Sequence, residues 1–317
     1  MHAMKRSWII WALVGLIAGG VLAWVRERRV DVAPGGDTAA ATSSSTDDGS
    51  ADLAARCREA ASALAVELDD TFDVLVEPPF VLAGNMRKSD LKSHLEHSVL
   101  RPAEAMWRAY FVGRPDGPIV VLLLTDRGVR PAEDREPGYA YRGWSRRLFG
   151  DEAVSGFGYY KPDRRTLVMN IDTGAGTLSH ELTHALIVHD FPHPPDWLNE
   201  ALASLHEQCR LDDGELVGMV NWRLAALREA IDAGTLRPLA ELVTQDDFRA
   251  NRMGMNYAQA RYFAMYMQHR GKLREFYTYY RDHREGGGVA AIEHVLGERI
   301  GEVEASYVAW VKGLRLE

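Results

Sequence analysis

The 317-residue sequence has few of the features that mark disulfide-rich, cysteine-ligated or nucleic-acid-binding proteins. Its two cysteines, Cys57 and Cys209, are too few for a disulfide framework and form no C-x-x-C pair. A single bridge outside the cytoplasm and two buried thiols are equally good interpretations. The formal net charge is −8, whereas a nucleic-acid-binding protein typically has a basic face. We therefore expect neither a cysteine-ligated metal nor a nucleic-acid partner.

A phosphate-binding loop and internal repeats are also missing from the sequence. Glycines occur in the segment Asp172-Thr173-Gly174-Ala175-Gly176, but no G-x-x-x-x-G-K-[ST] pattern accompanies them. No repeat is visible at periods of 20–50 residues. Hydrophobic residues make up 46% of the chain and charged residues 26%, which is ordinary for a globular protein. The length allows one or two domains with a sizeable core.

An uncharged apolar run covers residues 7–25, after a short tail of residues 1–6. Nineteen helical residues at about 1.5 Å each span about 30 Å, the thickness of the hydrocarbon core of a bilayer. Tryptophans lie near both ends of the run, where their rings favour the membrane interface. A cleaved signal peptide is the alternative, but the run is long for one and residues 18–23 offer a poor cleavage site. We expect a single-pass transmembrane anchor.

Basic residues flank the apolar run on both sides, so the positive-inside rule gives little direction. A short tail followed by one span and a long domain favours an extracytoplasmic catalytic domain. Residues 26–52 then connect the anchor to the folded part. Small, polar and acidic residues dominate this segment, which predicts a flexible linker.

Residues 53–176 predict a mixed α/β half. Strong helix formers alternate along the chain with short apolar or alternating runs that are typical of strands. The pair Pro78-Pro79 predicts a turn after the first strand. The expected helices are 53–68, 88–111 and a short one at 143–149, and the expected strands are 72–76, 118–125, 158–161 and 166–171.

Residues 177–317 predict an almost entirely helical half. After the helix that begins near residue 177, the apolar positions favour helices at 197–209, 214–233, 255–270, 272–283 and 299–316. The predicted fold class is therefore α+β, with a mixed sheet in the N-terminal half and helices in the C-terminal half.

The motif H-E-x-x-H occurs in the segment that begins the helical half. His180 and His184 are four residues apart, so on a helix both imidazoles point to the same side and can bind one zinc ion. Glu181 follows the first ligand and can reach a water molecule on that ion, which makes it the candidate general base. Without a third ligand, however, the same pattern also occurs on helices that bind no metal.

Four residues are candidates for the third ligand. His189 would be rotated about 140° away from the ligand face, and His193 lies beyond the helix between two prolines. The pattern H-E-x-x-H-x-x-G-x-x-H requires glycine and histidine where the chain has Ile187 and Asp190. Glu200 fits best, because a second helix beginning near residue 196 can turn it back toward the first.

The stretch HELTH followed by WLNEALA resembles the gluzincin metallopeptidases, in particular their aminopeptidase-like and peptidase MA-like branch. The resemblance covers residues 160–280 and implies a zincin-like unit in which Glu200 is the third zinc ligand. It also assigns oxyanion stabilisation to Tyr257, in the stretch NYAQARYF, although packing alone would also explain an aromatic residue there. Ala201 replaces the usual glycine, and the exopeptidase motif G-x-M-E-N is missing, so recognition of a free N-terminus is not implied.

Together these features predict a membrane-anchored zinc peptidase that hydrolyses peptide or protein substrates, with the strand at 166–171 available to pair with an extended substrate. His206 could orient a ligand histidine, although a solvated surface position is the favoured interpretation. An inactive scaffold with a structural zinc ion is one alternative, and it would need His189 or His193 as a fourth ligand. A zinc hydrolase acting on other substrates is the second alternative.

Overall fold

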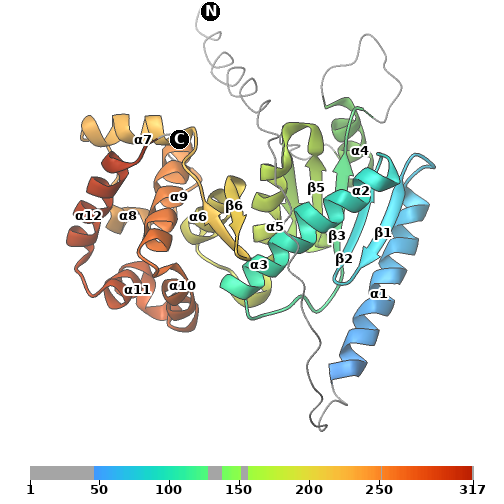
Figure 1. Cartoon of the computed structure of the whole chain (residues 1–317), viewed down its shortest axis with the longest axis horizontal. Helices are drawn as coiled ribbons and strands as arrows, with labels where there is room; N and C mark the ends of the chain where they lie inside the picture. The colour runs from blue at the N-terminus through green and yellow to red at the C-terminus, as the bar shows by residue number, and fades with distance from the viewer. Residues whose placement is uncertain (1–45, 128–137, 151–155, 251, 316–317) are drawn as a thin grey trace, which may run out of the picture.

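A computed structural model describes residues 46–127, 138–150, 156–250 and 252–315 (Figure 1). The expected N-terminal tail and the expected anchor at residues 7–25 lie outside these ranges. Among the helices in the described ranges, none is long and apolar enough to cross a membrane. Figure 1 shows an α/β half and a helical half side by side, with α5 and α6 between them.

The described part of the N-terminal half contains a five-stranded mixed sheet in the order β1-β2-β3-β5-β4. The inner pairs β2–β3 and β3–β5 are parallel, whereas the edge strands β1 and β4 pair antiparallel with their neighbours. The α+β class and the mixed sheet are therefore confirmed. The strands are β1 (Asp73–Glu77), β2 (Phe80–Gly84), β3 (Ile119–Leu124), β4 (Gly158–Lys161) and β5 (Thr166–Asn170).

Both faces of this sheet are covered, which explains the continuous apolar run in β3. Val121 and Leu123 pack into the main core with the helices on one face. Leu122 and Leu124 point to the opposite face and pack in a smaller cluster under α1 and α4. Successive strand residues point to opposite faces, so a strand covered on both faces must be apolar throughout.

The helices of this half mostly follow the expected positions. Helix α1 begins at Thr46, so residues 46–52, expected to belong to the flexible linker, are helical. The segment after Pro78-Pro79 was expected to be only a turn, but it forms the fully buried strand β2. The helices are α1 (Thr46–Glu67), α2 (Lys88–His94), the π-helical η2 (Leu95–Leu100), α3 (Arg101–Ala109) and α4 (Tyr139–Phe149).

The C-terminal half is largely helical, but one predicted helix is wrong. Instead of one helix over 214–233, the chain forms a two-stranded hairpin followed by α7. The short helices η3 (Pro162–Arg164), η4 (Ile171–Thr173) and η5 (Arg284–Gly286) connect other elements. The remaining elements are α5 (Ala175–Asp190), α6 (Asp196–Glu207), β6 (Cys209–Asp212), β7 (Glu215–Gly218), α7 (Arg223–Asp232), α8 (Leu239–Leu242), α9 (Met253–His269), α10 (Leu273–Asp282), α11 (Gly287–Leu296) and α12 (Ile300–Gly313).

Helix α6 is enclosed between α5 and α9, and a buried arginine on α9 fixes its C-terminal end. The Arg261 side chain is fully buried and donates hydrogen bonds to the carbonyl groups of Ser204, Leu205, Gln208 and Met219. Ser204 and Leu205 lie in the last turn of α6, where carbonyl groups lack helical partners, so the guanidinium satisfies them.

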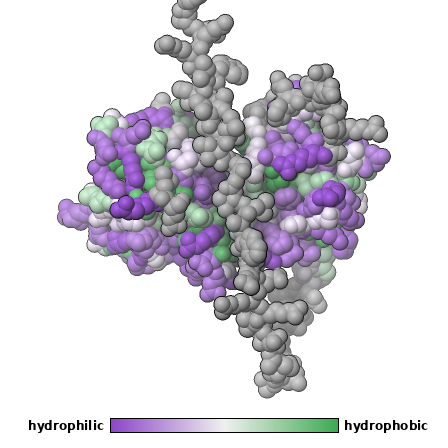
Figure 2. Space-filling model, turned by 45° about the horizontal axis from the view of Figure 1, so that its top comes forward, coloured by the Kyte–Doolittle hydropathy of each residue, from purple (hydrophilic) through white to green (hydrophobic). Residues whose placement is uncertain are grey.

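On the face shown in Figure 2, hydrophilic residues predominate and hydrophobic residues form small separate patches.

Candidate metal centre and its cleft

Helix α5 approaches α6 closely at its first turn. Helix α5 begins directly after Gly174, whose positive φ of 104° is a backbone conformation that favours glycine. A Cβ atom on Gly176 would lie 2.4 Å from the Glu207 carbonyl oxygen at the end of α6, so only glycine fits there. This close approach brings the face of α5 that carries His180 and His184 against α6.

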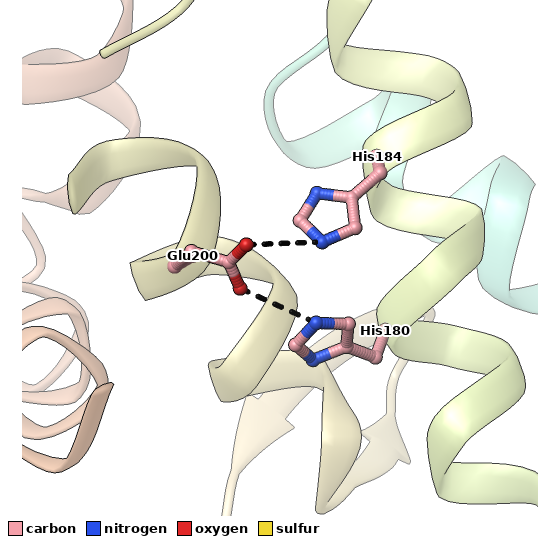
Figure 3. A group of neighbouring side chains, drawn as sticks. All are labelled: His180, His184 and Glu200. Atoms are coloured by element: carbon pink, nitrogen blue, oxygen red, sulfur yellow. Dashed lines mark ion pairs between the residues drawn. The ribbon is translucent and has the colours of Figure 1, made fainter. Parts of the chain in front are cut away.

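Figure 3 shows Glu200 of α6 pointing between the two imidazoles of α5. Its Oε2 atom lies 3.3 Å from His180 Nε2, and its Oε1 atom lies 3.6 Å from His184 Nε2. The Glu200 side chain is 2% exposed, and the two histidine side chains are 14% and 13% exposed. The structure therefore brings the two predicted histidines and the predicted third residue into one buried group.

The spacing of this group suits a tetrahedral metal ion. Ligand atoms that each lie about 2.0–2.1 Å from a tetrahedral zinc ion are separated by about 3.3 Å. The observed nitrogen–oxygen distances are close to this value, and the ligand atoms of all three residues lie within 4.8 Å of one another. Glu200 Oε2 is also buried without a hydrogen-bond partner among the described residues. The group can therefore hold a metal ion.

The rival third ligands lie elsewhere. His189 and His193 do not belong to the group, and His193 is exposed in the loop after α5 with a φ of 53°. Asp190 is the last residue of α5, and its side chain accepts hydrogen bonds from Tyr277 and Arg281 instead. The expected rotation of His189 away from the ligand face is consistent with its position on α5.

Asn199 positions one of the histidines, a role that the sequence did not reveal. Its Oδ1 atom lies 2.8 Å from His184 Nδ1. A histidine that donates Nδ1–H to an oxygen keeps the lone pair on Nε2, which is the atom that faces Glu200. Asn199 lies directly before Glu200 in the WLNE stretch, so the contact could have been inferred once α6 was placed beside α5.

The ionisation of the three residues reflects their burial and their mutual contacts. Burial alone would raise the pKa of Glu200, but the contacts with His180, His184 and Arg249 lower its pKa to about 2. Burial lowers the pKa of His184. At His180 the neighbouring Glu200 carboxylate outweighs burial and the pKa is raised. Glu200 thus remains an anionic ligand at any physiological pH.

A cleft of about 330 Å³ opens beside this group and contains both predicted catalytic residues. Glu181 and Tyr257 line it. Burial raises the pKa of Tyr257, and the negative charge of Glu200 adds to this shift, so the phenol stays protonated. The other lining residues are Tyr159, Tyr160, Pro162, His180, His184, Val188, Asn199, Glu200 and Arg249.

Arg249 is a second member of the site that the sequence did not reveal. Its guanidinium contacts Glu200 and lies 3.4 Å from the Tyr257 hydroxyl. Nothing in the local sequence marks this arginine, because its position depends on how the segment between α8 and α9 folds over the cleft.

The expected substrate-pairing strand is wrong. Strand β5, over Thr166–Asn170, is hydrogen-bonded to β3 on one side and to β4 on the other, so it has no free edge. The edge strand next to the cleft is β4, and its residues Tyr159 and Tyr160 line the cleft. Among the described strands none pairs with the outer edge of β4, so this edge is the one available to an extended chain.

Two further expectations concern His206 and the cysteines. His206 is 1% exposed, with Nδ1 2.9 Å from the Thr183 hydroxyl oxygen, so the favoured surface position is wrong. Cys57 and Cys209 are both free, so they form no bridge, and of the two thiols expected to be buried Cys57 is buried and Cys209 only partly so.

No protein-family model matches the chain, and no curated protein matches it. The geometry of α5 and α6 therefore has to carry the functional interpretation.

Proposed function

We propose that this protein is a zinc-dependent peptidase of the gluzincin type, anchored to a membrane through residues 7–25 with its catalytic domain on the extracytoplasmic side. The observation that carries the proposal is the buried His180–His184–Glu200 group beside a cleft lined by Glu181. Three protein ligands with an open position are typical of catalytic zinc sites.

Each residue of the cleft then has a chemical task. When bound, zinc would supply the Lewis acid that polarises the scissile carbonyl and lowers the pKa of a water molecule. Glu181 accepts the proton of the attacking water and passes it to the leaving amine. The Tyr257 hydroxyl donates a hydrogen bond to the oxyanion, and the loss of such a donor typically raises the barrier by about 3–4 kcal/mol. The free edge of β4 pairs with the substrate backbone.

The structural-zinc alternative needs a fourth protein ligand that closes the site. His189 and His193 were its candidates, and neither belongs to the group of potential ligands in the described residues. The group instead adjoins a cleft large enough for part of a peptide. These observations favour a catalytic site over a structural one.

The test compares the full-length chain, purified in a non-ionic detergent, with two variants. Wild type should bind one zinc ion and hydrolyse casein or members of a peptide library. Glu181→Gln should keep the zinc and lose hydrolysis, because only the general base is removed. Glu200→Ala should bind zinc about 10²–10³-fold more weakly. This is the loss expected when one ligand contributes a quarter of the binding free energy of about 10–16 kcal/mol that is typical of zinc sites with four protein ligands.

Two results would contradict the proposal. Stoichiometric zinc in Glu200→Ala would show that Glu200 is not the third ligand. A zinc-loaded wild type that cleaves no peptide, with Glu181→Gln indistinguishable from it, would favour the scaffold.

A further inference from the structure

Arg249 presents a cation in the mouth of the cleft. Its Nη2 atom lies 2.7 Å from Glu200 Oε1, its Nε atom lies 3.1 Å from Asp196 Oδ2, and its Nη1 atom lies 3.4 Å from the Tyr257 hydroxyl. It lies in the segment that joins α8 to α9 and lines the cleft together with Glu181 and Tyr257. The guanidinium therefore adjoins both the metal group and the proposed oxyanion donor.

This arginine differs from the structural arginines of the same half. Arg261 is fully buried, and its two terminal nitrogens bind four backbone carbonyls. Arg249 is 48% exposed, and its described contacts use three of its five N–H groups. The guanidinium is half exposed, lines the cleft and has N–H groups that these contacts do not use, so Arg249 retains the capacity to bind a further acceptor.

A metal ion increases that capacity. The ion would share the Glu200 carboxylate, which weakens the attraction between Glu200 and Arg249. Two carboxylates, Glu181 and Glu200, line the cleft together with the one guanidinium. A divalent ion, with the histidines neutral, would offset the two lining carboxylates, and Asp196 would remain the carboxylate partner of Arg249 outside the lining. The cation exposed in the cleft is then the Arg249 guanidinium, which favours an anionic substrate group beside it.

We infer that Arg249 binds a substrate carboxylate next to the scissile bond, so that the peptidase selects peptides with an acidic residue or a free C-terminal carboxylate at that position. Guanidinium and carboxylate form paired hydrogen bonds of matching geometry. Arg249 contacts the Tyr257 hydroxyl, so a carboxylate that it binds lies beside the carbonyl under attack. The inference rests on the proposed peptidase function.

The test uses the full-length zinc-loaded protein and variants of one peptide that wild type cleaves. Glu, Gln or Lys is placed at each position flanking the scissile bond, and a parallel set ends there in a carboxylate or an amide. For wild type we expect kcat/KM to favour Glu over Gln by about 10–100-fold, the range of a hydrogen bond to a charged group. Preference for the free terminus alone would identify the α-carboxylate as the source.

Arg249→Met should reduce the Glu-to-Gln ratio to about 1, and Arg249→Glu should favour the Lys peptide. The matched control is Arg270→Met. Arg270 also joins a tyrosine hydroxyl, Tyr266, to a carboxylate, Glu298, but it lies at the far end of α9. This control should keep the wild-type ratio.

A second readout separates this inference from the peptidase proposal. Zinc-loaded Glu181→Gln should bind the Glu peptide more tightly than the Gln peptide in fluorescence anisotropy, and adding Arg249→Met should remove the difference. If wild type cleaves no peptide and this binding difference is nevertheless present, the peptidase proposal fails and the carboxylate site stands. An unchanged ratio in Arg249→Met, or an equal loss for all peptides together with loss of zinc, would overturn the carboxylate site.

Discussion

Helix α5 contacts two buried carboxylates, Asp190 at its C-terminus and Glu200 of α6 beside its middle, and the two carboxylates are bonded in opposite ways. At the C-terminal end, Asp190 Oδ1 accepts hydrogen bonds from the backbone amides of Val112 and Gly113. Its Oδ2 atom accepts from the Tyr277 hydroxyl and from Arg281. Beside the middle of α5, the Glu200 carboxylate faces His180 and His184, and its Oε2 atom has no hydrogen-bond partner among the described residues.

This difference separates a structural cluster from a functional one. The Asp190 cluster satisfies its polar atoms within the protein and joins α5 to α10 and to the segment after α3. The Glu200 group leaves a buried oxygen unsatisfied and opens onto a cleft. A buried polar atom without a partner is unfavourable unless a ligand completes it. We therefore expect stability to depend on Asp190 and metal binding to depend on Glu200.

The largest expected effect is on stability. Asp190→Ala leaves two backbone amides and the Tyr277 hydroxyl without their acceptor and leaves Arg281 with Asp282 alone, so the free energy of unfolding should fall by about 3–5 kcal/mol. Glu200→Ala in the zinc-free protein removes the contacts with Arg249 and the two histidines but leaves no backbone amide without its acceptor, so the free energy of unfolding should fall less, by about 1–2 kcal/mol. Chemical denaturation of the two variants in the presence of a chelator measures the difference. Equal losses in both variants would contradict the distinction between the two carboxylates.

A smaller effect is expected where Asn199 orients His184. Asn199→Ala removes the acceptor for His184 Nδ1–H and should weaken zinc binding by about 10–100-fold, as is typical for partners of ligand histidines. The matched control is Asn85→Ala, a buried asparagine that bonds Thr125 beside the sheet. This control should lower stability without weakening zinc binding. Competition with a chromophoric chelator measures the affinity, and equal zinc binding by both variants would exclude the orienting role.

The metal group could be predicted from the sequence because it depends on local geometry. The spacing of His180 and His184 fixes their common face on any helix. Glu200 lies on the next helix, after a short loop, so few arrangements of the two helices are possible and one of them brings Glu200 to the same ion. Arg249 and the edge position of β4 could not be predicted, because both depend on how distant segments assemble.

One missed element did have a local signal. The hairpin of β6 and β7 closes through Asp213 and Gly214, whose φ values are 48° and 79°. Two positive φ values in a two-residue loop are typical of a type I′ turn, and Asp-Gly is a strong signal for it. The apolar spacing over 214–233 outweighed this signal in our interpretation, so the prediction extended a helix through a hairpin.

The smallest effect lies midway along α5 and appears only as a dependence on pH. Burial lowers the pKa of His206 to about 3, from 6.5 in an unfolded chain. Between these values the unfolded chain binds the extra proton, so the stability that neutral His206 contributes at neutral pH is lost as the pH falls below 6.5. At pH 5.5 this loss should be about 1.4 kcal/mol relative to pH 7.5.

His206→Gln removes this titration. Between pH 7.5 and 5.5 the free energy of unfolding of this variant should therefore fall by about 1.4 kcal/mol less than that of wild type. Urea unfolding of the full-length chain at the two pH values measures this difference. His97→Gln is the control, because His97 is half exposed on the π-helical turn η2 and should leave the wild-type dependence intact. The Thr183 hydroxyl and His206 Nδ1 form a hydrogen bond. If His206→Gln keeps the pH dependence of wild type, this buried contact does not keep the imidazole neutral. The interface between α5 and α6 would then tolerate a charge at His206, and the contrast between structural and functional groups would rest on Asp190 and Glu200 alone.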